Sequence, residues 1–163
     1  DAAAAALDTA AALLDSGGLF GIYPEGTRSR TGHLYKGRTG VARLSHRTGA
    51  PIIPVGLMGM RDIQPPDAPF PKFFNAATIS FGQPLFPDEH GDPGTNPMAF
   101  RAMTDALMFR IRHLSGQHYI NRYAPSKAEL EAQNDPSVLN ERYDIMADKP
   151  LDERRTGTDL LNA

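Results

Sequence analysis

The spacing of apolar and polar positions predicts helices and buried strands that follow one another along the chain. Residues 2–14 are rich in alanine and leucine and are followed by two glycines, which predicts a helix with a left-handed C-cap. In residues 19–23 the apolar side chains do not alternate with polar ones, which predicts a strand buried on both faces. Residues 37–47 predict a second helix, because Val41 and Leu44 fall on one face.

The second half of the chain repeats this pattern with a longer helix. Residues 51–57 and 78–82 predict strands, and the prolines of the first place it at an edge or at a strand end. Asn96 and Pro97 form a typical helix start. The helix that follows has an apolar face spaced by three and four positions, made of Phe100, Met103, Leu107, Ile111 and Leu114. This order of elements predicts an α/β fold with a mixed, mostly parallel sheet flanked by helices.

Length and composition predict one folded domain followed by a tail. A chain of 163 residues has room for a single hydrophobic core. We place the domain in residues 1–123 and expect residues 124–163 to form a polar, poorly ordered tail, because the apolar residues after position 134 show no period. Ser126 and Glu129 have the spacing of a capping box, which predicts a short helix near the start of this tail.

Positive charge is concentrated in one part of the chain. The whole sequence has 17 Lys+Arg and 19 Asp+Glu. Between positions 16 and 61, however, it has seven basic residues and a single acidic one, Glu25. A glycine-containing polar turn, residues 24–32, lies inside this window and follows the first predicted strand, and α/β folds place ligands at such strand ends. Guanidinium groups pair with phosphate and carboxylate. The pattern therefore indicates an anion-binding loop, with an ordinary solvated basic face as the alternative.

The same turn resembles a conserved block of a known enzyme family. From position 23 it reads Tyr-Pro-Glu-Gly-Thr-Arg-Ser-Arg-Thr-Gly, which is similar to the third sequence block of the glycerolipid, or lysophosphatidate, acyltransferases. The lysine–glycine step at 36–37 and the apolar run at 51–55 resemble the family's next features in order and spacing. The resemblance covers residues 7–57 and extends more loosely to about residue 123. It implies the carboxyl-terminal part of an α/β acyltransferase domain.

The resemblance also implies a reaction and roles for individual residues. The family moves a fatty acyl group from acyl-CoA or acyl-carrier protein, as co-substrate, to the hydroxyl of a lysophospholipid, foremost lysophosphatidate giving phosphatidate. Arg28 is assigned to the acceptor phosphate, with help from the backbone amides of Gly26 and Thr27. Lys36 adds to the positive field. Glu25 either orients a glycerol hydroxyl or holds Arg28, and the sequence leaves both roles open.

The chain departs from the family pattern in one respect. The family's catalytic His-x4-Asp block is missing, because the residues five positions after its five histidines are Arg38, Pro51, Thr95, His118 and Tyr123. We therefore assign no catalytic residue in this chain and expect it to be inactive alone. A non-catalytic phosphate-binding or interaction module is the alternative, and the sequence upstream of this chain discriminates between the two.

Other classes of partner find little support in the sequence. The acidic cluster at 88–92 lacks metal-ligand spacing, so we expect no metal and no resident cofactor. The basic window lacks interleaved aromatic residues, which argues against nucleic acid. The substrate class implies the cytoplasmic face of a membrane, reached peripherally or through an amino-terminal part. Phe70, Phe73 and Phe74 beside Lys72 are one candidate for such contact, but we favour the alternative that they cover the core.

Overall fold

The computed structural model describes residues 2–64, 68–72, 74–94, 96–126 and 129–130. The chain divides into two units, residues 1–124 and 125–163, and each is considered by itself. Of residues 124–163, which we expect to form a polar, poorly ordered tail, the structure describes 124–126 and 129–130, and the others lie outside the described residues.

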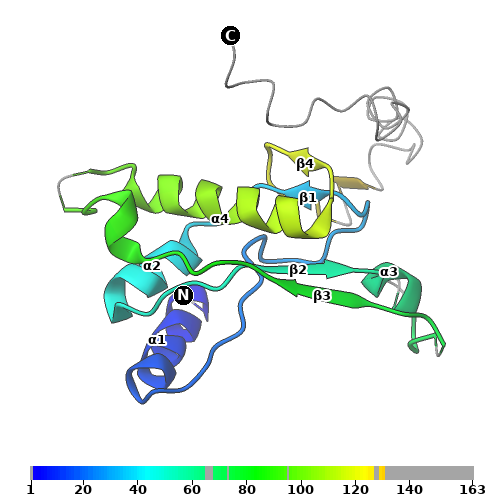
Figure 1. Cartoon of the computed structure of the whole chain (residues 1–163), viewed down its shortest axis with the longest axis horizontal. Helices are drawn as coiled ribbons and strands as arrows, with labels where there is room; N and C mark the ends of the chain where they lie inside the picture. Colours follow the sequence, from blue (N-terminus) through cyan, green and yellow to red (C-terminus); the bar gives the residue numbers. More distant parts are fainter. Residues whose placement is uncertain (1, 65–67, 73, 95, 127–128, 131–163) are drawn as a thin grey trace, which may run out of the picture. The chain divides into compact units, whose positions relative to one another are not determined.

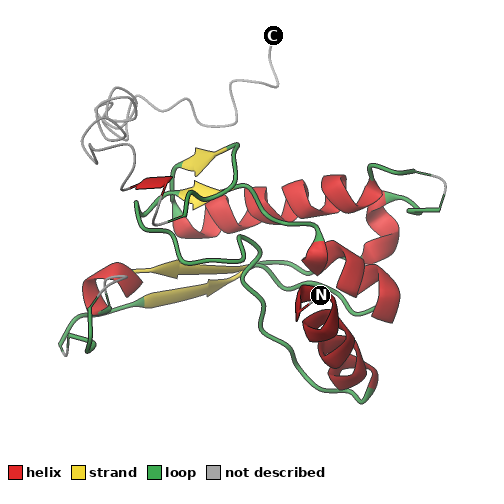
Figure 2. Cartoon of the chain, turned by 180° about the vertical axis from the view of Figure 1, so that it is seen from behind, coloured by secondary structure: helices red, strands yellow, loops and turns green. Residues whose placement is uncertain are grey.

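The first unit contains the named helices and strands of the described chain (Figures 1 and 2). The helices are α1 (Ala2–Asp15), α2 (Gly40–Thr48), α3 (Met60–Ile63), the 3-10 helix η1 (Pro87–His90) and α4 (Ala99–Ser115). The strands are β1 (Leu34–Tyr35), β2 (Val55–Met58), β3 (Thr78–Phe81) and β4 (Tyr119–Ile120). The expected α/β class is confirmed, and so is the left-handed glycine predicted after α1, because Gly17 has a φ of 84°. Gly49, with a φ of 72°, is the C-cap of α2.

The strands form two pairs of opposite kind. β1 pairs with β4 in parallel, with Leu34 opposite Tyr119. β2 pairs with β3 in antiparallel fashion, with Val55 opposite Phe81. An isolated antiparallel bridge between Ile52 and Leu85 lies just outside this second pair. The sheet structure is therefore mixed, as the sequence predicts, but it is divided into two short ladders.

Helix α4 supplies most of the main core. Its apolar face packs on β2 and α2, which confirms the periodicity of its sequence (Figure 1). The buried cluster consists of Leu34, Val41, Ala42, Leu85, Met103, Leu107, Met108 and Ile111. The helix begins at Ala99, later than its sequence predicts, and the Asn96 side chain accepts a hydrogen bond from the Met98 amide at 3.0 Å. A smaller cluster of Ala10, Ala11 and Leu44 joins α1 to α2.

The prediction of a buried strand at residues 19–23 is wrong. These residues form no strand, and the Leu19 and Tyr23 side chains are 95% and 73% exposed. A strand needs a neighbour to take up its backbone hydrogen bonds. In the described chain β1 pairs with β4 and β2 pairs with β3, so neither ladder includes this run. Apolar composition predicts burial, but it cannot supply the neighbouring strand.

The loop after β2 also differs from its prediction. It contains the four-residue helix α3, and the Phe70 side chain is 78% exposed while that of Phe74 is fully exposed. These two rings do not cover the core, so that prediction is wrong for both, and Phe73 lies outside the described residues. The loop lies at the end of the β2–β3 pair, together with α3 (Figure 1).

The predicted capping box is present in the second unit. The Ser126 amide donates to the Glu129 carboxylate at 2.7 Å, and the Glu129 amide donates to the Ser126 hydroxyl at 3.2 Å. Hydrogen bonding of the Glu129 carboxylate with the Ser126 amide, and then with the Ser126 hydroxyl, lowers the pKa of Glu129, because it favours the charged form.

Candidate functional site

The polar turn belongs to a longer loop, residues 24–38, whose two ends are tied together. The Arg38 amide donates to the Pro24 carbonyl at 2.8 Å. The Tyr35 amide donates to the Glu25 carboxylate at 2.9 Å. These two bonds join the start of the loop to β1 and the residues after it. The 24–38 loop is therefore closed at its base.

The tip of the loop is held by its own hydroxyl side chains. The Gly32 amide donates to the Ser29 hydroxyl at 3.0 Å, and the Thr31 and Tyr35 hydroxyls share a hydrogen bond of 2.9 Å. Gly32 has a φ of 85°, which an L side chain rarely adopts. The hydroxyl residues of the turn thus stabilise a conformation that depends on glycine.

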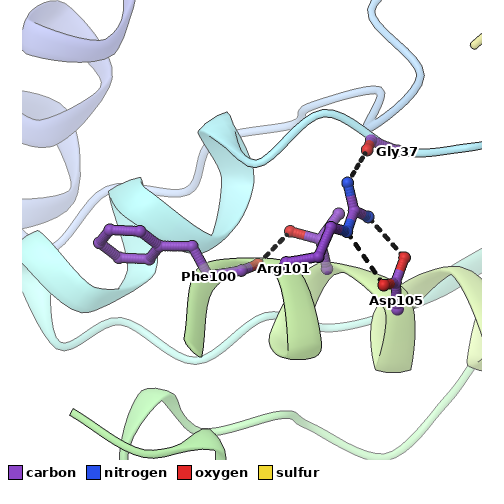
Figure 3. Close-up of polar contacts among 5 residues, drawn as sticks. Gly37, Phe100, Arg101 and Asp105 are labelled. Carbon is purple, nitrogen blue, oxygen red and sulfur yellow. Dashed lines mark hydrogen bonds and ion pairs between the residues drawn. The ribbon is translucent and has the colours of Figure 1, made fainter. Parts of the chain in front are cut away.

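Three side chains from distant elements bind backbone carbonyls of the 24–38 loop. Gln117 donates to the Gly32 carbonyl at 2.9 Å, and Arg61 donates to the Arg30 carbonyl at 3.2 Å. Arg101 of α4 donates to the Gly37 carbonyl at 2.8 Å and pairs with Asp105 one turn later at 2.6 Å (Figure 3). The loop is held from three sides, so its exposed groups have a defined position.

The predicted site residues share this loop. Thr27 and Arg28 are exposed near its tip, and Lys36 is half-buried near its base. No hydrogen bond or ion pair of the Arg28 side chain is found among the described contacts. Gly26 has a φ of 74° and its amide already donates to the Tyr23 carbonyl at 3.0 Å. The Gly26 amide is therefore already used within the turn, whose shape depends on this glycine.

Sequence reasoning missed two residues that lie over the loop. The Arg38 guanidinium stacks on the Tyr123 ring at 5.1 Å, and the Lys36 ammonium lies 5.9 Å from the same ring. A Cβ atom on Gly26 would lie 3.2 Å from Cδ of Arg38, so this side chain passes directly over the turn. The basic window already contains Arg38, but no sequence pattern indicates Tyr123.

The sequence leaves two roles open for Glu25, and the structure gives no support to one of them, the holding of Arg28. Its carboxylate accepts the Tyr35 amide, and no contact with Arg28 is found among the described residues. Burial raises the pKa of Glu25, and the hydrogen bond from Tyr35 offsets only part of that effect. The Glu25 side chain therefore serves as a hydrogen-bond acceptor for the loop's own backbone, and its charged form is disfavoured by burial.

Replacing Glu25 with glutamine should change how stability depends on pH. Folding raises the pKa of Glu25. The contribution of this group to the free energy of unfolding is therefore fully present when the group is protonated, and it is lost as pH rises through the folded pKa. Glu25→Gln should therefore be more stable than the wild type at neutral pH, and the two stabilities should converge as pH falls below the ordinary glutamate pKa of about 4.3. Urea unfolding at a series of pH values measures this. A difference that is constant with pH would contradict it.

An apolar cavity of about 760 Å³ adjoins the loop. One side is formed by the exposed apolar run at 19–23, and the other by core residues that include Leu34, Leu107 and Ile111. Glu25 and Gln117 are among its few polar lining residues. The run therefore faces the core across a space that the described chain does not fill. Within the described residues, no cluster of three or more histidine or acidic side chains could hold a metal ion.

Comparison with known proteins shows what the first part of the chain is similar to. A model of the acyltransferase family matches residues 1–58, which contain α1, the apolar run, the whole 24–38 loop and α2. The matched segment is less than half of the chain, and it contains the predicted site residues.

One curated relative is similar over a segment of about the same length. Over 53 residues the chain is 38% identical to a chloroplastic 1-acyl-sn-glycerol-3-phosphate acyltransferase, BAT2, of Brassica napus. The similar segment covers 32% of this chain and 15% of that relative, so the chain spans only a small part of the relative's length. No solved structure matches the chain.

Proposed function

We propose that this chain is the acceptor-positioning part of an enzyme that transfers a fatty acyl group to the hydroxyl of a lysophospholipid. The acyl donor is a thioester, acyl-CoA or acyl-carrier protein, and lysophosphatidate giving phosphatidate is the foremost reaction. The observation that supports this most is the closed 24–38 loop with Arg28 exposed at its tip. The name of the Brassica relative agrees with this acceptor.

The residues of this chain would act on the acceptor and not on the thioester. In the transfer, the acceptor oxygen attacks the thioester carbonyl, the carbon–sulfur bond breaks, and the hydroxyl proton passes through a general base to the leaving thiolate. Arg28 would pair with the acceptor phosphate, which fixes the hydroxyl near the carbonyl. Lys36 and Arg38 would add positive charge near the acceptor phosphate. The base itself would come from the His-x4-Asp block, which is not in this sequence.

The exposed apolar run supports the proposal that other parts of the acyltransferase domain complete the site. Leu19, Phe20 and Ile22 face a cavity whose far wall is the core. Strands of the same domain that pair with residues 19–23 would fill this space and remove these side chains from water. On this account the chain alone lacks both the base and a finished sheet, and it is inactive by itself.

The test is acyl-CoA-dependent thiol release with lysophosphatidate as acceptor. It compares this chain with the protein that carries it together with the rest of the acyltransferase domain. We expect release by the longer protein and none by this chain. Failure of the longer protein with a panel of lysophospholipid acceptors would overturn the proposed activity. The second candidate, a non-catalytic phosphate-binding module, is favoured by the missing His-x4-Asp block and would then be retained.

We also propose that the β2–β3 end of the chain contacts a membrane surface, on the cytoplasmic face. No helix among the described residues is long and apolar enough to cross a membrane. The exposed rings of Phe70 and Phe74, with exposed Lys72 between them, have the composition of an interfacial contact. A lipid acceptor whose acyl chains stay in the bilayer would require the site to lie near that surface.

Removing the two rings should weaken binding to vesicles of phosphatidylcholine and phosphatidylglycerol. Phe70→Ser combined with Phe74→Gly is suitable, because Phe74 has a φ of 75° that glycine adopts without strain. Each buried ring contributes about 1.5–3 kcal/mol, so for the two rings together we expect a loss of about 100-fold or more in a sedimentation assay. Phe86→Ser, at an exposed ring before η1, is the control. Equal binding by the double variant and the control would contradict the membrane contact.

A further inference from the structure

Arg61 reaches the 24–38 loop from outside the segment that the family model matches. It lies in α3, directly after β2, whereas the family match ends at residue 58. Its guanidinium donates to the Arg30 carbonyl at 3.2 Å, across 31 residues of sequence. A Cβ atom built on Gly32 would collide with Nη1 of the same guanidinium. The Arg61 side chain therefore lies over the part of the loop that follows Arg28.

We propose that Arg61 is a positioning residue for the phosphate of the acceptor. It holds the turn at residues 30–32 by the hydrogen bond to Arg30 and places a second guanidinium on the same loop as Arg28. This inference rests on the proposed function, because it assigns a partner to the same anion site. The ligand that it concerns is a phosphate monoester or inorganic phosphate.

The chemistry of the contact favours this role over simple bracing. A guanidinium carries five N–H donors, and a carbonyl oxygen accepts one or two of them. Arg61 is exposed, and its hydrogen bond to Arg30 is the contact described for its side chain. A single exposed hydrogen bond of 3.2 Å adds little to stability. The positive charge of Arg61 and its other N–H donors therefore lie on the surface of the loop, where they can bind an anion.

Gly32 determines both the shape of the turn and the place of the Arg61 side chain. Its φ of 85° fixes the turn, and its missing side chain leaves the space that the Arg61 guanidinium occupies. Its amide donates to Ser29 and its carbonyl accepts from Gln117, so the residue cannot shift without breaking those bonds. A side chain at this position would displace Arg61 and would also strain the turn.

The first measurement is titration of inorganic phosphate into this chain, followed by the amide NMR shifts of residues 26–32. Arg61→Ala should weaken phosphate binding by about 3- to 10-fold, as expected for the loss of one charged donor. Arg61→Lys, which keeps the charge and loses the planar fork, should lie between the alanine variant and the wild type. Arg110→Ala is the matched control, because Arg110 also donates to backbone carbonyls, those of Gln83 and Pro84, at 3.0 and 2.9 Å.

The second measurement is kinetic and uses the longer acyltransferase. Arg61→Ala should raise KM for the lysophosphatidate acceptor by a similar factor, with KM for acyl-CoA unchanged and kcat changed less than KM. A purely structural role would lower the unfolding temperature and would not separate the two KM values. Unchanged phosphate binding and unchanged acceptor KM in Arg61→Ala, with binding by the wild type intact, would overturn the role of Arg61 alone. No phosphate binding by the wild-type chain and no turnover by the longer protein would overturn the proposed function as well.

Discussion

Replacing Arg28 with alanine in the longer acyltransferase should lower kcat/KM for lysophosphatidate by roughly 10- to 100-fold. A charge-assisted hydrogen bond contributes about 1.5–3 kcal/mol, and each 1.4 kcal/mol corresponds to about a factor of ten. The loss should appear in both constants, because a poorly held phosphate weakens binding and also misplaces the hydroxyl. Arg28 is exposed at the tip of a loop that is closed at its base, so its removal leaves the loop's described hydrogen bonds intact.

A matched control separates this effect from a change in net charge. Arg43→Ala removes one charge from the same basic window, but the Arg43 guanidinium stacks on the Phe100 ring at 4.7 Å and not on the loop. An acceptor without phosphate, a monoacylglycerol, is the second control, because Arg28 has nothing to pair with there. Equal losses in Arg28→Ala and Arg43→Ala, or an equal loss with both acceptors, would remove Arg28 from the phosphate site.

Replacing Gly56 with alanine should lower the free energy of unfolding by about 1–3 kcal/mol. A Cβ atom at this position would lie 2.6 Å from Cβ of Leu114 and 2.9 Å from the backbone nitrogen of Ser115. These atoms belong to the last turn of α4, whose backbone cannot move away from β2 without opening the core. Urea unfolding of this chain, with the slope of the transition held constant, measures the change.

Gly21→Ala is the matched control for this substitution. No atom lies within 4 Å of the position where its Cβ would be, and its φ is not positive. The same change of one methyl group should therefore leave stability within about 0.5 kcal/mol of the wild type. A loss in Gly21→Ala as large as that in Gly56→Ala would show that close packing of β2 on α4 is not the cause.

The candidate site could be read from the sequence because its chemistry is local. The turn residues from Glu25 to Arg28 adjoin one another in the chain, and their types alone indicate an anion site in the context of a basic window. The partners that hold this turn could not be read in the same way. Gln117 and Arg101 reach it across 85 and 64 residues, and the donor and acceptor pair only because α4 and β4 lie beside the loop.

The sequence by itself determined helices α1, α2 and α4, the glycine cap of α1, the β3 strand, the capping box and the residues of the loop. Each of these depends on side chains or backbone angles within a few residues, so the chain records them directly. Only the tertiary structure decided the pairing of strands, the exposure of residues 19–23 and the place of Arg61 over Gly32. Pairing, burial and long-range contacts depend on which elements meet in space, and an apolar run or a lone arginine does not specify its neighbour.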